Sequence, residues 1–180
     1  TLVLLQTNRF LEILSNLAIT DTSEWEPNES IHQEATEAFC QCANKVHVPM
    51  AQHEYVLNVL TKMLTIPTTN LGTVARALQE QASHSVNRRA MSRNRNLLQA
   101  LVAVVRSEET PLDAKESACA ALVDLSEDTM EIALPVLLDA LVQSLKSPAA
   151  RTNIESIVTN RIHEYSVQTI LNLAKQQPNL

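Results

Sequence analysis

The chain contains 180 residues, 45% of them hydrophobic and 19% charged, a composition that excludes an intrinsically disordered protein. Its single glycine, Gly72, argues against folds built from β-hairpins, Rossmann units or phosphate-binding loops, because those folds need glycine at tight turns and near ligands. The formal net charge of −6 disfavours a general nucleic-acid-binding protein, which needs a basic surface to displace counterions. We therefore predict an all-α protein.

Hydrophobic residues recur at intervals of three and four along most of the chain, which predicts a succession of amphipathic helices. Proline marks several boundaries: Pro27 lies after the first helix, Pro67 after the third, and Pro135 in the first turns of the seventh. A polar, basic link at 85–96 separates the fourth and fifth helices, and the last segment is expected to break near His163. The predicted helical segments are residues 2–19, 31–45, 55–64, 71–84, 97–105, 111–127, 130–145 and 149–177.

The cysteine content indicates the cellular compartment, and the apolar runs indicate whether a segment could span a membrane. Three cysteines are too few and too sparse for a disulfide framework, which is typical of a protein in a reducing compartment: Cys40, Cys42 and Cys119. Even the apolar run 2–19 contains Arg9 and Glu12, so no segment is predicted to span a membrane. Because the chain opens without a starting methionine or a basic leader, we expect a segment of a longer intracellular protein, cytoplasmic or nuclear.

The second helices of successive pairs share a pattern of small residues followed by leucine. Related stretches begin at Glu34 (EATEAFCQCAN), Thr73 (TVARALQEQAS) and Lys115 (KESACAALVDLSED), about 40 residues apart. Alanines at these positions allow neighbouring helices to approach closely, while larger side chains fill the space between pairs. A period of this length built from helix pairs predicts a stacked helical repeat protein.

Short motifs carry a resemblance to HEAT and armadillo repeats. Residues 96–102 followed by 114–122 resemble one such repeat, and 133–141 resemble the proline and paired leucines that open another. LSNLA at 14–18 and ILNLA at 170–174 look like the ending of armadillo repeats. The resemblance covers most of the chain. It implies a single domain, 1–180, with a right-handed α-α superhelix of about four helix pairs that acts as a non-catalytic protein-binding scaffold.

One branch of the armadillo family is disfavoured. Importin-α-like proteins place Trp four residues before Asn on the inner helix, to clamp a basic peptide. Here Glu12 precedes Asn16 and Gln168 precedes Asn172 at that spacing, and Trp25, the sole tryptophan, lies in a predicted loop. A receptor for nuclear localisation signals is therefore not expected.

The resemblance also indicates where a protein or peptide partner would bind. In these solenoids the inner helices line a concave surface, so polar residues on them are the default contacts. Alignment of the repeats selects Gln41, Glu80 or Gln81, Asp124 and Asn172. Any one of them can equally be a solvent-facing residue of an amphipathic helix, and the prediction depends on their sharing one surface.

Four arginines form the densest charge feature, within a link that contains no acid: Arg88, Arg89, Arg93 and Arg95. A guanidinium group binds phosphates or carboxylates through paired hydrogen bonds, so the link could bind an acidic tail, a phosphorylated segment or RNA. This is the alternative function, a nucleic-acid-binding or phosphate-binding solenoid. The other interpretation is a solvated linker whose arginines pair with acids on adjacent turns.

Acidic residues gather just after that link. They could bind a basic peptide, or they could be two solvated helix ends in which the first acids stabilise a helix N-terminus. The residues are Glu108, Glu109, Asp113, Glu116, Asp124, Glu127, Asp128 and Glu131.

Metal-site and catalytic interpretations are disfavoured. Cys40 and Cys42, with His32 and His47 nearby, invite a zinc site, but residues two apart on a helix point in different directions and no CxxC or HExxH is present. No recognised signature surrounds any serine, cysteine or histidine as a nucleophile or base. We expect no metal, no cofactor and no enzymatic activity.

Overall fold

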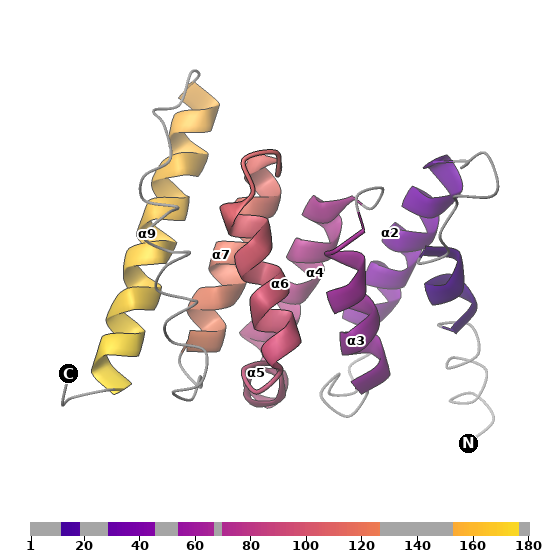
Figure 1. The fold of residues 1–180 in the computed structure, drawn as a ribbon, viewed down its shortest axis with the longest axis horizontal. Helices are drawn as coiled ribbons and strands as arrows, with labels where there is room; N and C mark the ends of the chain where they lie inside the picture. Colours follow the sequence, from indigo (N-terminus) through magenta and orange to yellow (C-terminus); the bar gives the residue numbers. More distant parts are fainter. Residues whose placement is uncertain (1–11, 19–28, 46–53, 67–69, 127–152, 177–180) are drawn as a thin grey trace.

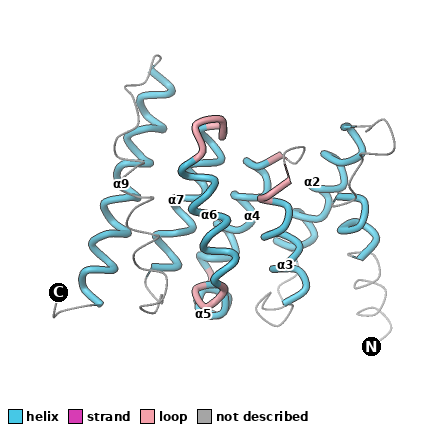
Figure 2. The backbone as a smooth tube through the Cα atoms, viewed as in Figure 1, coloured by secondary structure: helices cyan, strands magenta, loops and turns pink. Residues whose placement is uncertain are grey.

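A computed structural model describes residues 12–18, 29–45, 54–66, 70–126 and 153–176. Within these ranges the chain forms helices and turns and no strand, which confirms the all-α prediction for this part (Figure 2). A helix covers 12–18. The others are α2 (Glu29–Lys45), α3 (Glu54–Met63), α4 (Leu71–Ser83), α5 (Ser85–Met91), α6 (Arg95–Arg106), α7 (Leu112–Ser126) and α9 (Asn153–Gln176).

Two asparagines determine where central helices begin. The Asn70 side chain accepts a hydrogen bond from the Thr73 backbone N–H at 3.2 Å, at the start of α4. Asn94 accepts from the Leu97 backbone N–H at 3.0 Å, at the start of α6. Each cap satisfies a backbone donor that has no partner within its own helix, and such a cap contributes about 1 kcal/mol.

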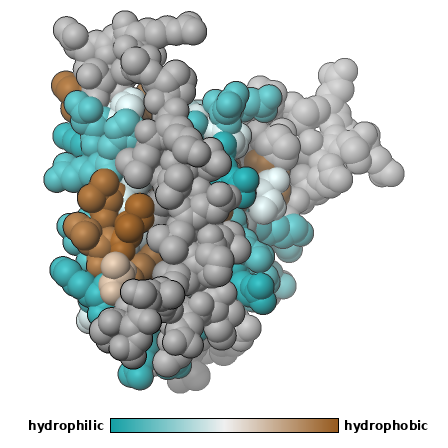
Figure 3. Space-filling view, turned by 60° about the vertical axis from the view of Figure 1, so that its left-hand side comes forward, coloured by the Kyte–Doolittle hydropathy of each residue, from teal (hydrophilic) through white to brown (hydrophobic). Residues whose placement is uncertain are grey.

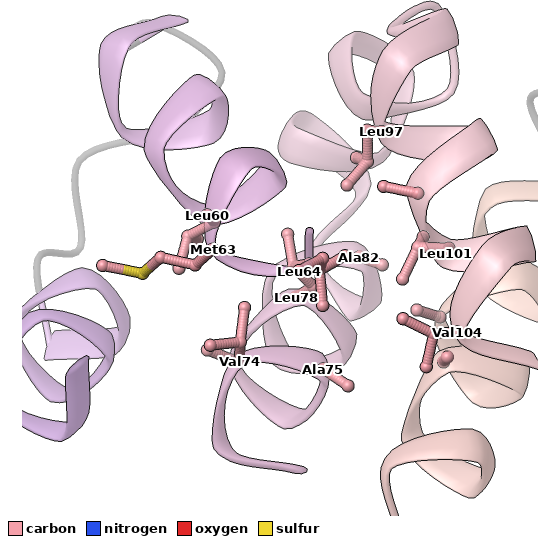
Figure 4. Packing of buried hydrophobic residues seen from close by; sticks show 14 of the residues in the cluster. Leu60, Met63, Leu64, Val74, Ala75, Leu78, Ala82, Leu97, Leu101 and Val104 are labelled. Atoms are coloured by element: carbon pink, nitrogen blue, oxygen red, sulfur yellow. The ribbon is translucent and has the colours of Figure 1, made fainter. Parts of the chain in front are cut away.

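The core is formed by apolar side chains from α3, α4 and α6 that point toward one another (Figure 4). Leu60 of α3, Leu78 of α4 and Leu101 of α6 are fully buried. Burial of one such side chain stabilises the fold by roughly 1.5–3 kcal/mol. Alanines in α4 and α7 keep the helices close: Ala75, Ala77, Ala82, Ala114, Ala118 and Ala121 are buried.

The helices form two rows along the long axis of the molecule (Figure 1). One row, called the helix row below, consists of α2, α4, α7 and α9, and each member packs against the next. The second contains α3 and α6, which contact each other and pack against α4 and α7 respectively. Short α5 lies across one edge, against α4 and α7.

Polar contacts join successive helices at similar separations in sequence. The Gln81 amide on α4 donates to the Ala43 carbonyl at the end of α2, 38 residues earlier, at 3.3 Å. Ser15 in helix 12–18 shares a hydrogen bond with Tyr55 of α3, and these residues are 40 apart.

Helices α7 and α9 run in the same direction. The Arg161 guanidinium on α9 donates a hydrogen bond to the Glu116 carboxylate, in the first half of α7, at 2.9 Å. The Asn172 amide on α9 donates to the hydroxyl of Ser126, the last residue of α7, at 3.1 Å. The partners are separated by 45 and 46 residues, so residue numbers rise together along both helices.

The single glycine lies where the first turns of α4 and α7 meet. A Cβ atom placed on Gly72 would lie 2.5 Å from an Asp113 carboxylate oxygen, closer than nonbonded atoms allow. Glycine therefore lets the Asp113 carboxylate rest against the N-terminal turn of α4, where a negative charge is favourable. The absence of a side chain serves close packing here, since the Gly72 φ angle is not positive.

Two predictions about helix boundaries are wrong. The link at 85–96 contains a helix, α5, whose Asn87 and Met91 are buried against the rest of the molecule. The expected break near His163 is absent, because α9 is continuous from Asn153 to Gln176. The predicted helix at 130–145, with Pro135, and most of the one at 2–19 lie outside the described residues.

Candidate functional site

The predicted partner-binding residues all lie on the helix row. Gln41 is exposed on α2 and Glu80 is exposed on α4, while Asp124 on α7 and Asn172 on α9 are half-buried. The row therefore carries one polar side chain from the predicted set on each of its four helices. These helices are amphipathic: apolar residues are buried on one face and polar residues are exposed on the other.

Gln81, the alternative to Glu80, is a structural residue. Only 4% of its surface is exposed, and its side chain connects three elements. Its amide donates to the Ala43 carbonyl at 3.3 Å, and its Oε1 accepts from the Asn87 side chain of α5 at 2.6 Å. Glu80, one residue earlier, is exposed, so of the two it is the one whose surface a partner could reach.

Asn172 makes contacts within the protein. Its amide donates to the Ser126 hydroxyl of α7 at 3.1 Å, and its Oδ1 accepts from Gln168 at 2.9 Å. The side chain thus joins α9 to α7. A partner that hydrogen-bonded to Asn172 would have to replace one of these bonds.

The four arginines lie on structured backbone rather than in an extended link. Arg88 and Arg89 are in the last turn of α5, Arg93 follows in a turn, and Arg95 is the first residue of α6. Arg89, Arg93 and Arg95 are exposed, and Arg88 is half-buried. We call Arg88, Arg89, Arg93 and Arg95 the basic edge.

Sequence reasoning missed a neighbour of this edge. Val86 of α5 is 63% exposed, more than any other large hydrophobic residue in the described part of the chain. It lies three residues before Arg89, a spacing that brings two side chains together on a helix. The three-residue spacing of Val86 and Arg89 is visible in the sequence, but it indicates neighbouring side chains only if residues 85–91 are helical.

The acidic cluster divides between two locations. Glu108, Glu109 and Asp113 lie in the turn between α6 and α7 and at the start of α7, at the opposite end of α6 from the basic edge. Glu116 binds Arg161 of α9, and the hydrogen bond and charge of this carboxylate raise the pKa of Arg161. Glu127, Asp128 and Glu131 lie outside the described residues.

The described cysteines are packed as small apolar groups. Burial, with the nearby charges of Glu37 and Glu80, raises the pKa of the Cys40 thiol to about 12. Burial likewise raises the pKa of Cys119 to about 12, against an opposing hydrogen bond from Ser166. A thiol acts as nucleophile or metal ligand in its ionised form, so burial of these two thiols favours the less reactive protonated form. In the described ranges no three His, Cys, Asp or Glu side chains are grouped to hold a metal ion; His47 lies outside them.

A hydrophobic area covers part of the outer surface of α9 (Figure 3). Helix α9 carries the exposed large hydrophobic residues Ile157, Val167 and Leu171. Among the described residues, no helix combines the length and the apolar character needed to cross a membrane.

Comparisons of the chain with protein-family models, with curated proteins and with solved structures find no match in any of the three. Functional conclusions therefore depend on the chain's own residues and their arrangement.

Proposed function

We propose that the chain is a HEAT-like or armadillo-like solenoid, a right-handed α-α superhelix that serves as a non-catalytic scaffold for a protein partner. The observation that carries this proposal is the register of the contacts between helices. Hydrogen bonds join residues 38, 40, 45 and 46 apart, close to the period of about 40 in the sequence. A stack of similar helix pairs, in which each unit contacts its neighbours, produces such similar offsets.

The proposed binding surface is the polar face of the helix row. Gln41, Glu80 and Asp124 come from three helices that pack side by side, so an extended segment lying across the row could meet all three. Their amide and carboxylate groups accept hydrogen bonds from a partner's backbone or basic side chains. Exposed Glu34 and Glu37 on α2 add negative charge and favour a partner segment that carries lysine or arginine.

Matched double variants test the surface. One variant combines Gln41→Arg with Glu80→Gln on the helix row, and the control combines Asn58→Arg with Gln99→Arg on exposed positions of α3 and α6. Both raise the net charge by the same amount. The proposal predicts that partners captured from a cell lysate are lost with the row variant and kept with the control, while both retain their helical circular dichroism and melting temperature.

Partners that survive the row variant, or that are lost equally from both, contradict the assignment of the surface. The solenoid itself is tested separately by small-angle X-ray scattering. An elongated envelope is expected for a stack of helix pairs, and a near-spherical one would contradict the architecture.

A further inference from the structure

The basic edge lies in the longest part of the chain that lacks acidic residues. Residues 81–107 contain no Asp or Glu, although the chain as a whole has a net charge of −6. Among the described residues, no carboxylate forms an ion pair with Arg89, Arg93 or Arg95. The interpretation of these arginines as partners of acids on adjacent turns therefore does not hold for these three.

The exposed side of α5 combines positive charge with an apolar group. Val86, Arg89 and Arg93 follow one another at three- and four-residue steps, and all three are exposed. Arg93 stays in register because Ser92, the residue between it and the helix, keeps helical backbone angles. The surface thus presents a valine beside two guanidinium groups, with Arg95 one residue beyond the turn.

The backbone under this surface is anchored. On the inner side of α5, Asn87 is 4% exposed and donates to Gln81 at 2.6 Å, and Met91 is buried. The Ser92 hydroxyl is also buried and donates to the Arg89 carbonyl at 3.1 Å. The arginines therefore project from a fixed backbone, which lowers the entropy lost when they bind a ligand.

We propose that the basic edge, together with Val86, is a docking surface for an acidic peptide segment that carries an apolar side chain. The segment's carboxylates would pair with Arg89, Arg93 and Arg95, and its apolar residue would cover the valine. This surface consists of residues other than those of the polar face of the helix row, so the proposal goes beyond the proposed function and does not depend on it.

The composition of the edge favours a peptide over RNA. Residues 84–96 contain no Phe, Tyr or Trp on which a base could stack, and single-stranded nucleic-acid sites rely on such stacking. A phosphate backbone also has no group that would gain from covering an exposed valine. Charge complementarity and the valine together fit alternating acidic and apolar side chains.

Fluorescence anisotropy with a short labelled peptide of glutamates around a central leucine tests the proposal. The variant R89Q/R93Q is compared with K62Q/K175Q, which removes the same charge from exposed positions on α3 and α9. We expect R89Q/R93Q to weaken binding about tenfold, and the control to change it by less than about twofold. Thermal unfolding should be the same for both variants.

The apolar contact has its own test. Val86→Ser should weaken binding of the leucine peptide and leave binding of a peptide with serine at that position unchanged. The proposal is overturned by any of four results: no peptide binding at low ionic strength, equal weakening by both charge variants, an equal effect of Val86→Ser on both peptides, or tighter binding of a single-stranded RNA oligonucleotide than of the peptide.

Discussion

The helix row and the basic edge are held in place by different forces. In the row, α4 and α7 bury alanine, leucine and valine against both neighbours, and polar contacts such as Arg161 with Glu116 lie at the periphery. On the basic edge, α5 has seven residues and is fixed by few groups, chiefly Asn87 and Met91. A surface carried by the row should therefore tolerate polar substitutions, whereas the edge should depend on single hydrogen bonds.

The largest expected effect is the protection of thiols inside the helix row. Cys40 and Cys119 are buried, whereas Cys42 is half-buried. We expect Cys42 to react with a thiol reagent in the native protein and the other two to react roughly a thousandfold more slowly than in the unfolded chain, because the row must open first. Mass spectrometry after timed labelling measures this, and equal labelling of all three would mean that the row is not stably packed.

Core truncation in α6 comes next. Leu101→Ala removes a fully buried side chain and should lower the free energy of unfolding by about 2–5 kcal/mol, measured by urea denaturation. Gln99→Ala, exposed on the same helix, is the control and should change it by less than about 0.5 kcal/mol. Similar losses for the two variants would be incompatible with the packing between α3, α4 and α6.

The stability of the basic edge should depend on the side-chain amide of Asn87. Asn87→Ala removes the buried 2.6 Å hydrogen bond between α5 and α4 and should cost about 1–2 kcal/mol. The effect should be local: hydrogen exchange should accelerate at the Arg88 and Ser92 amides and stay unchanged in α7. Exposed Asn96→Ala is the control. Uniform acceleration throughout the protein would show that α5 is part of the same cooperative unit as the row.

Alkaline pH should weaken the row through its thiols. The folded protein holds Cys119 protonated with a pKa of about 12, against 9.0 for an ordinary thiol, so unfolding releases a proton above pH 9.0. The contribution to stability is fully present below pH 9.0 and is lost as the pH rises toward about 12. Cys119→Ala should make the decline in stability with pH less steep, and an unchanged slope would contradict a buried neutral thiol.

The smallest effect concerns the contact between α4 and α7. Gly72→Ala gains helix propensity, up to about 1 kcal/mol, but it displaces the Asp113 carboxylate, so its net effect should be under about 1 kcal/mol. In an Asp113→Ala background the same change should be clearly stabilising. A double-mutant cycle measures the coupling, and additivity would mean that the two residues do not touch.

Sequence patterns located α2, α4 and α7 of the row, but they missed the continuity of α9 and the short helix α5. The stripe of Leu97, Leu101 and Val105 predicted α6, because apolar residues at this spacing gather on one face when the segment is helical. Residues 85–91 have no such stripe: Val86 is exposed, and only Met91 is a large buried apolar side chain. A helix of seven residues does not form without tertiary support, so its local sequence resembled a polar link.

For the candidate binding residues, too, the sequence predicted some features and only the structure showed others. The period of about 40 residues predicted that Gln41, Glu80, Asp124 and Asn172 would share one surface. The four helices that carry them pack in succession. The sequence could not decide between Glu80 and Gln81, because the choice depends on the angle at which α4 meets α2 and α5. Nor could it show that Asn172 already binds Ser126, 46 residues away.

The sequence by itself determined the all-helical class and the central helices, since these depend on the spacing of apolar residues within each segment. Only the tertiary structure decided that α5 is a helix, that α9 continues past His163, and that Val86 and Arg89 are exposed on the same short helix. The physical reason is the range of the forces involved. Amphipathic spacing acts within a helix, whereas burial of Asn87 and Met91 depends on elements that only the folded chain brings together.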